Sequence, residues 1–210
     1  MIDSTITIIY IAFGLGMLHA LDADHILTIT GISARKNQWQ QVMRYSLHWA
    51  IGHSFSLLII GVSIFLLGSS FNESFSMYAE IIVATVLAAI GFNLLLNAKQ
   101  KLPHTESSVK ENFQSSHKAL AIGSIHGIAG TASILALIPV TKISDPYLAL
   151  SYLVIFSIGI LISMMLFGGV LRHSIKRLIH YYPRSIVMVQ MVAGVLAIIF
   201  SANLLIGFMG

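Results

Sequence analysis

The chain has 210 residues, of which 56% are hydrophobic and 10% are charged. A soluble domain carries about 25% charged residues, so this deficit, together with a mean hydropathy of +0.85, predicts a chain that lies in a lipid bilayer. The sequence has no cysteine, which excludes disulfides, thiolate metal sites and thiol-redox chemistry.

Six segments are apolar and long enough to span a membrane, which takes about 20 residues of helix. They are 4–33, 45–68, 78–98, 119–140, 147–171 and 186–208. The predicted fold class is therefore an all-α membrane protein with six transmembrane helices. The first segment follows Asp3 rather than a basic residue and leads into a polar motif, so we expect a span and not a cleavable signal peptide.

The basic residues fall almost entirely on one side of this arrangement. Eleven of the twelve Lys and Arg lie in predicted loops one, three and five, and Lys142 lies on the other side. The eleven are Arg35, Lys36, Arg44, Lys99, Lys101, Lys110, Lys118, Arg172, Lys176, Arg177 and Arg184. Loops rich in Lys and Arg stay in the cytoplasm. We therefore expect a multi-pass inner-membrane protein with both termini outside, and no nucleic-acid partner for its net charge of +4.

The two halves of the chain resemble each other at a shift of 107 residues. The matched positions are Gly16, His19, Gly52, Ser56 and Gly61 with Gly123, His126, Gly159, Ser163 and Gly168. Each half holds three spans, an odd number, so the second half must enter the membrane from the opposite side. The sequence predicts a 3+3 inverted repeat, which is frequent in transporters. The repeats are 1–98 and 119–210, and 99–118 is a polar cytoplasmic linker.

Several ionisable residues lie within the predicted spans, where they are costly and usually functional. The first span contains HALDADHI, with two histidines and two aspartates in seven residues, which is too expensive to bury for packing alone. The second span contributes His53 and the fourth His126. The candidate metal residues are His19, Asp22, Asp24, His25, His53 and His126.

In a straight helix, the two histidine and two aspartate side chains of HALDADHI cannot all point at one small ion. At about 100° per residue, His19, Asp22 and His25 share a sector of about 120°, whereas Asp24 points about 140° away from His19. Either Asp24 orients a histidine, or the helix unwinds here, which is tolerated where backbone lines a cavity. If Asp24 and His19 both bind, residues 20–24 must contain a break or a wide turn.

The other membrane histidines are weaker candidates. His48 and His53 lie five positions apart, about 140° around a helix. We favour His53, which shares a face with Trp49 and Ser56, whereas an interhelical hydrogen bond is at least as good an explanation of His48. Glu80 sits at the outer end of the third span, within reach of the interface. His104, His117, His173 and His180 are interpreted as solvated loop histidines.

Mixed histidine and aspartate without cysteine favours a borderline divalent ion, because imidazole suits nickel, copper, zinc, cobalt and iron, whereas magnesium and calcium prefer oxygen. The segment from His19 to Ile26 resembles the histidine, four residues, aspartate-histidine signature of the nickel/cobalt transporter family. Gly52-His53-Ser54 resembles its second motif. The resemblance implies transport of Ni²⁺ or Co²⁺, with His19, Asp24 and His25 as ion-recognition residues and His53 as their partner.

The fourth span departs from the acidic later motif of the better-known eight-span members. His126-Gly-Ile-Ala-Gly130-Thr131 is instead similar to short urease-accessory or exporter-like membrane relatives. From this resemblance we expect uptake of nickel or cobalt, with zinc still open, and no prosthetic group. The hydrolase motif His-Glu-x-x-His is missing, so we expect no enzymatic activity. Metal export and proton-coupled export of another small solute remain alternatives, and a homo-oligomer stays open.

Overall fold

The computed structural model describes residues 2–33, 38–67, 73–98, 109–128 and 139–207, and all regular secondary structure within these ranges is helical. The helices are α1 (Ile2–His19), α2 (Ala23–Ser33), α3 (Trp39–Leu67), α4 (Glu73–Asn97), α5 (Val109–Ile128), α7 (Pro146–Tyr181) and α8 (Ser185–Ile206). Residues 139–142 are also helical.

Candidate membrane spans account for most of this helical chain. Stretches of α3, α4, α7 and α8 are each long and apolar enough to cross a bilayer, and α1 with α2 makes a fifth span if the bent pair counts as one. The chain therefore fits a multi-pass membrane protein. Of the predicted fourth span, α5 supplies the part up to Ile128, and residues 129–138 lie outside the described ranges.

Several helices extend beyond the bounds that the sequence pattern predicts, and α7 and α5 extend furthest. Helix α7 does not end near residue 171 but continues to Tyr181, so the basic stretch predicted as loop five is helical. Lys and Arg are good helix formers, and the first proline after this stretch is Pro183, which cannot continue a helix. Helix α7 begins where Asp145 accepts a hydrogen bond from the Tyr147 amide at 2.9 Å. Helix α5 begins at Val109, inside the predicted linker.

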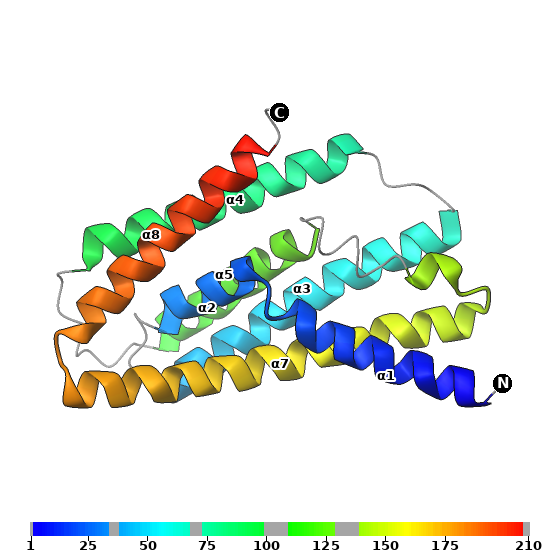
Figure 1. The fold of residues 1–210 in the computed structure, drawn as a ribbon, viewed down its shortest axis with the longest axis horizontal. Coiled ribbons are helices and arrows are strands. Elements are labelled where there is room, and N and C mark those ends of the chain that lie inside the picture. The colour runs from blue at the N-terminus through cyan, green and yellow to red at the C-terminus, as the bar shows by residue number, and fades with distance from the viewer. Residues whose placement is uncertain (1, 34–37, 68–72, 99–108, 129–138, 208–210) are drawn as a thin grey trace.

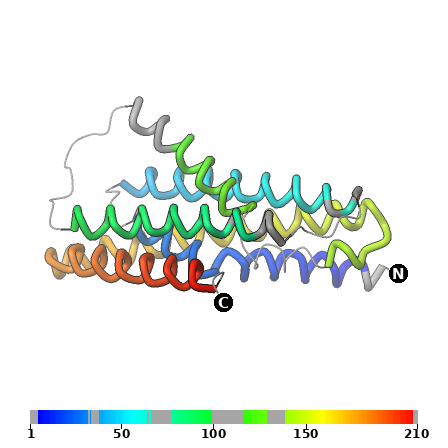
Figure 2. The backbone as a smooth tube through the Cα atoms, turned by 90° about the horizontal axis from the view of Figure 1, so that it is seen from above, coloured from blue at the N-terminus to red at the C-terminus, as the bar shows by residue number. Residues whose placement is uncertain are grey.

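The helices pack mainly in pairs. Helix α1 lies along α7, α5 lies along α3, and α3 and α7 contact each other at the centre. Helices α4 and α8 run side by side in Figures 1 and 2, and Figure 1 shows this pair on the opposite side of the molecule from α1 and α7. The short helix α2 lies between these groups and contacts α4, α7 and α8.

Glycines allow two of these pairs to approach closely. The contacts are Gly16 on Phe156 and Gly159 on Phe13 between α1 and α7, and Gly123 on Trp49 and Gly52 on Leu120 between α5 and α3. In each case a Cβ would overlap the carbonyl oxygen of the partner helix. Small residues at such positions let membrane helices pack backbone against backbone.

The apolar side chains divide between a core and an outer surface. Trp49, Tyr152 and Phe156 are the largest of the fully buried side chains. Large apolar side chains are also exposed on every long helix, for example Phe92 and Leu96, of which 57% and 79% are exposed. Exposed apolar surface of this extent is typical of a protein that faces lipid.

Candidate metal centre

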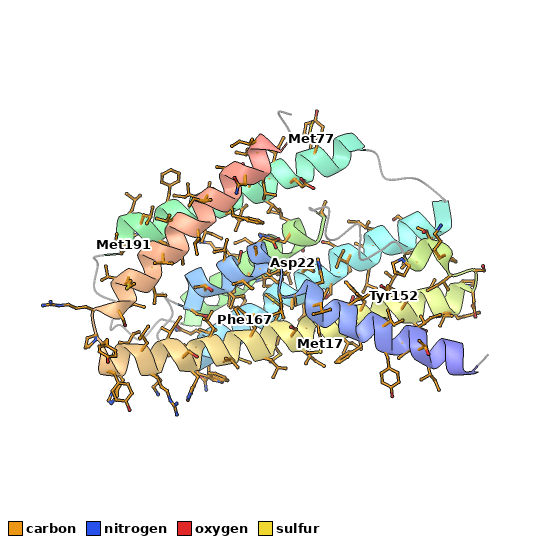
Figure 3. The ribbon with its side chains drawn as sticks, in the orientation of Figure 1. Met17, Asp22, Met77, Tyr152, Phe167 and Met191 are labelled. Carbon is orange, nitrogen blue, oxygen red and sulfur yellow. The ribbon has the colours of Figure 1, made fainter. Side chains whose placement is uncertain are left out.

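The first predicted span is broken at the HALDADHI motif. Helix α1 ends at His19, α2 begins at Ala23, and the chain bends by 53° between them. The break is a tight turn, in which the Leu21 amide donates to the Leu18 carbonyl at 2.9 Å and the Asp22 amide donates to the His19 carbonyl at 3.1 Å. Of the two alternatives that the sequence left open, a straight helix and an unwound one, the structure shows the unwound one, with the break at residues 20–22. Figure 3 shows Asp22 near the middle of the molecule, away from both ends of α7.

Three imidazoles meet at this break. His19 closes α1, His25 lies in the first turn of α2, and His53 reaches in from the middle of α3. Their ring centroids lie 4.8–5.2 Å apart, and the side chains are buried. One ring nitrogen from each lies within 4.8 Å of the others. Three helices therefore bring three imidazole nitrogen donors together in the interior.

The two aspartates contact two of these imidazoles. Asp24 Oδ1 accepts a hydrogen bond from His25 Nδ1 at 2.9 Å. Asp22 Oδ2 lies 2.9 Å from His19 Nδ1, close enough for an ion pair, but the two atoms do not form a hydrogen bond. A carboxylate on Nδ1 leaves the Nε2 lone pair free to bind an ion and raises its basicity.

Some of the ring nitrogens in this region are buried and have no hydrogen-bond partner. Within the described part of the chain, Nε2 of His25, Nδ1 of His53 and Nε2 of His126 have no hydrogen-bond partner. His19 Nε2 and His53 Nε2 share a hydrogen bond at 3.1 Å, which an ion bound by both nitrogens would replace. Two nitrogens at about 2.0–2.1 Å from a shared ion are separated by about 2.9 Å at a right angle and about 3.4 Å in a tetrahedron. The length of this hydrogen bond falls within that range, so an ion could replace the shared proton with little movement of the two rings.

His126 lies at the edge of this cluster. Its ring centroid is 6.3 Å from that of His25, and its Nδ1 donates to the Ile122 carbonyl at 2.9 Å. This hydrogen bond fixes the tautomer, so that Nε2 carries the lone pair. The ring is completely buried. His126 is therefore close to the three central imidazoles without being one of them.

An aromatic wall that was not predicted as part of the site holds the imidazoles. Trp49 stacks on His53 at 5.0 Å and 14° and packs edge-on against His25 at 4.7 Å and against His126 at 5.4 Å. Phe156 of α7 lies 5.7 Å from the ring of His19. The helical spacing offered one signal, since Trp49 and His53 are four residues apart and therefore share a face of α3.

The remaining predicted candidates lie elsewhere. His48 Nδ1 donates to the Arg44 carbonyl of its own helix at 2.8 Å, not across to another helix. Glu80 is 7% exposed and does not reach out to solvent. His117, His173 and His180 are exposed but lie on α5 and α7 rather than in loops, and His104 lies outside the described residues.

The carboxylates are the part of the site closest to the outside. The Asp22 side chain is 36% exposed and that of Asp24 is 20% exposed, compared with 5% for His19 and 2% for His25. A cation that enters past Asp22 would thus meet negative charge first and imidazole second. Two ionised carboxylates would also match the charge of a divalent ion.

Comparison with known proteins identifies a distant relative. The chain is 27% identical over 173 residues to the urease accessory protein UreH of Bacillus sp. (strain TB-90), a match that covers 77% of this chain and 75% of the relative. No family model and no solved structure matches the chain. At this identity, the comparison shows similarity to a urease accessory protein.

Proposed function

We propose that the chain is a membrane transporter that takes up divalent nickel or cobalt through the cluster of His19, His25 and His53. The observation that carries this proposal is the convergence of three buried imidazoles, two of them contacted by aspartates, at a helix break inside a multi-pass apolar bundle. Such groups are expensive at membrane depth and mark ion pathways. A broken helix at the middle of a bundle is also where transporters bind their substrates.

The donor set favours these ions over the alternatives. Three nitrogens with carboxylate support suit nickel, cobalt and zinc, whereas magnesium and calcium require mainly oxygen donors. The resemblance of HALDADHI and Gly52-His53-Ser54 to the nickel/cobalt transporter family selects nickel and cobalt from this group. The relative named as a urease accessory protein agrees with the similarity of the fourth span to urease-accessory membrane proteins.

We also propose six spans arranged as a 3+3 inverted repeat. The glycine contacts support it, because the contact of Gly16 with Phe156 becomes that of Gly123 with Trp49 when 107 is added to 16 and subtracted from 156. The same exchange converts the contact of Gly159 with Phe13 into that of Gly52 with Leu120. Residues 1–98 and 119–210 would be the repeats, joined by the linker 99–118.

The proposed orientation places both termini outside and the basic loops in the cytoplasm of an inner membrane. The starts of α3 and α8 and the end of α7 lie at one end of the molecule, on the left in Figure 1. The described basic residues of these segments are thus gathered at that end, as the positive-inside rule requires. Lys142, just before α7, belongs to the opposite end.

Metal binding by the purified chain tests the proposal. Tag-free protein in detergent should bind Ni²⁺ and Co²⁺ but not Mg²⁺ in an equilibrium titration, and His25→Ala should abolish this binding. His48→Ala is the matched control, since His48 lies on α3 but bonds to its own helix. Equal binding by the two variants would overturn the assignment.

The same titration separates the proposal from proton-coupled export of another solute. The contacts of His19 with Asp22 and His53 could also carry protons. A proton relay without a metal site predicts no nickel binding in the wild-type protein. Export of the metal predicts normal binding, with accumulation in cells reduced rather than raised by expression of the chain.

A further inference from the structure

A basic pocket lies far along α7 from the metal centre. It has a volume of about 380 Å³ and is lined by Trp39 at the start of α3 and by Arg172, His173 and Lys176 of α7. Its lining within the described residues contains no carboxylate. The pocket is therefore suited to an anion.

Arg172 gives the pocket a fixed charge in its wall. Only 6% of this residue is exposed, and a guanidinium presents its donors in a planar fork that matches the oxygens of a phosphate. Lys176 lies one turn further on the same face and is exposed, so its ammonium can approach an anion from the open side. Lysine binds phosphate as a point charge.

The position of the pocket fits the headgroup layer of a bilayer. The apolar run of α7 ends at Leu171, and Arg172 begins the basic stretch. The ring of Trp39 is half exposed and lies against Gly169, where a Cβ would come within 2.7 Å of it. Tryptophan is enriched at the membrane–water interface because its ring is apolar and its N–H is polar.

An apolar stripe leads from the pocket into the predicted hydrocarbon region. Ile162 and Leu166 are 37% and 58% exposed. At about 100° per residue, they fall within about 20° of His173 around α7. A molecule with a phosphate in the pocket could thus lay an acyl chain along Ile162 and Leu166, which a free phosphate ion would not need.

We propose that this pocket binds the phosphate of an anionic lipid headgroup, with Arg172 and Lys176 as its charged contacts. The site is separate from the metal centre and does not depend on which ion the chain transports. A bound lipid would contact both the start of α3 and the basic stretch of α7 at the membrane surface. Basic pockets between membrane helices commonly take such headgroups.

Native mass spectrometry of the full chain in neutral detergent tests this site. The probes are phosphatidylglycerol, phosphatidylcholine with the same acyl chains, and inorganic phosphate. Phosphatidylglycerol should bind more tightly than phosphatidylcholine, and Lys176→Gln should weaken its binding about fivefold, as expected for one basic residue near anionic lipid. Arg177→Gln, the neighbouring exposed residue that does not line the pocket, should weaken binding less than Lys176→Gln does, because its charge lies outside the pocket.

Three results would overturn the proposal. One is an equal loss in Lys176→Gln and Arg177→Gln, which would indicate a diffuse charge effect. Another is equal binding of the two lipids. The third is binding of inorganic phosphate as tight as that of phosphatidylglycerol and equally sensitive to Lys176→Gln, which would assign the pocket to a soluble phosphate compound. Lys176 is exposed, so this variant should fold even if Arg172→Gln does not.

Discussion

Replacement of Asp24 by asparagine should weaken nickel binding about 10- to 100-fold without abolishing it. Asp24 Oδ1 accepts a hydrogen bond from His25 Nδ1 at 2.9 Å and thereby presents His25 Nε2 to the ion. Asparagine keeps an oxygen that can accept this bond but removes the negative charge. Its amide group can also face Nδ1 instead, which would place the ring proton on Nε2 and block ligation.

The magnitude follows from the character of this hydrogen bond. A hydrogen bond to a charged group contributes about 1.5–3 kcal/mol, and each tenfold change in affinity corresponds to about 1.4 kcal/mol. The Asp24 side chain is 20% exposed, whereas that of His25 is 2% exposed. Partial solvation of the carboxylate places the expected loss in the lower part of this range.

Equilibrium titration of tag-free protein with Ni²⁺ measures this effect. Asp145→Asn is the matched control, because Asp145 caps α7 away from the metal centre and asparagine caps a helix equally well. Wild-type affinity in Asp24→Asn would show that the carboxylate does not support His25. Complete loss of binding would show that the carboxylate is indispensable rather than supporting, and either result would refute this reasoning.

Three further predictions concern packing, orientation and the aromatic wall. Gly16→Ala should lower the stability of the purified protein in thermal unfolding by about 1–3 kcal/mol, whereas Gly14→Ala, with nothing within 4 Å, should not; equal effects would contradict the close α1–α7 contact. In intact cells, an impermeant thiol reagent should label a single cysteine at position 3 but not at position 108, and the reverse pattern would overturn the orientation. Trp49→Ala should weaken nickel binding about two- to tenfold, consistent with the loss of ring contacts. Trp49→Phe should bind better than the alanine variant, and equal loss in both would argue against a stacking role.

The sequence predicted the parts of the fold that depend on apolar length. Helix α8 lies within two residues of its predicted bounds, because an uninterrupted apolar run determines both ends. The end of α7 was wrong by ten residues. Charged residues show where a helix leaves the hydrocarbon layer of the membrane, but not where the helix ends. Helix α7 continues past Arg172 and ends just before Pro183.

The helix break at the centre of the candidate site was predictable from helical geometry. Helical angles alone showed that His19 and Asp24 cannot face one point on a straight helix, and the chain breaks between them. The angles could not show that Asp24 would contact His25, its neighbour in sequence, because side-chain rotamers are set by packing. Trp49 was missed as part of the site because aromatic residues are common in membrane helices, and only its contacts distinguish it.

Uptake of nickel into proteoliposomes is the direct test of transport through the cluster of His19, His25 and His53. Wild-type protein, His25→Ala and His48→Ala would be reconstituted at equal density, and radioactive Ni²⁺ inside the vesicles would be counted over time. We expect uptake above protein-free vesicles for wild type and His48→Ala, and none for His25→Ala. Equal uptake by wild type and His25→Ala, or uptake by neither wild type nor His48→Ala, would contradict it.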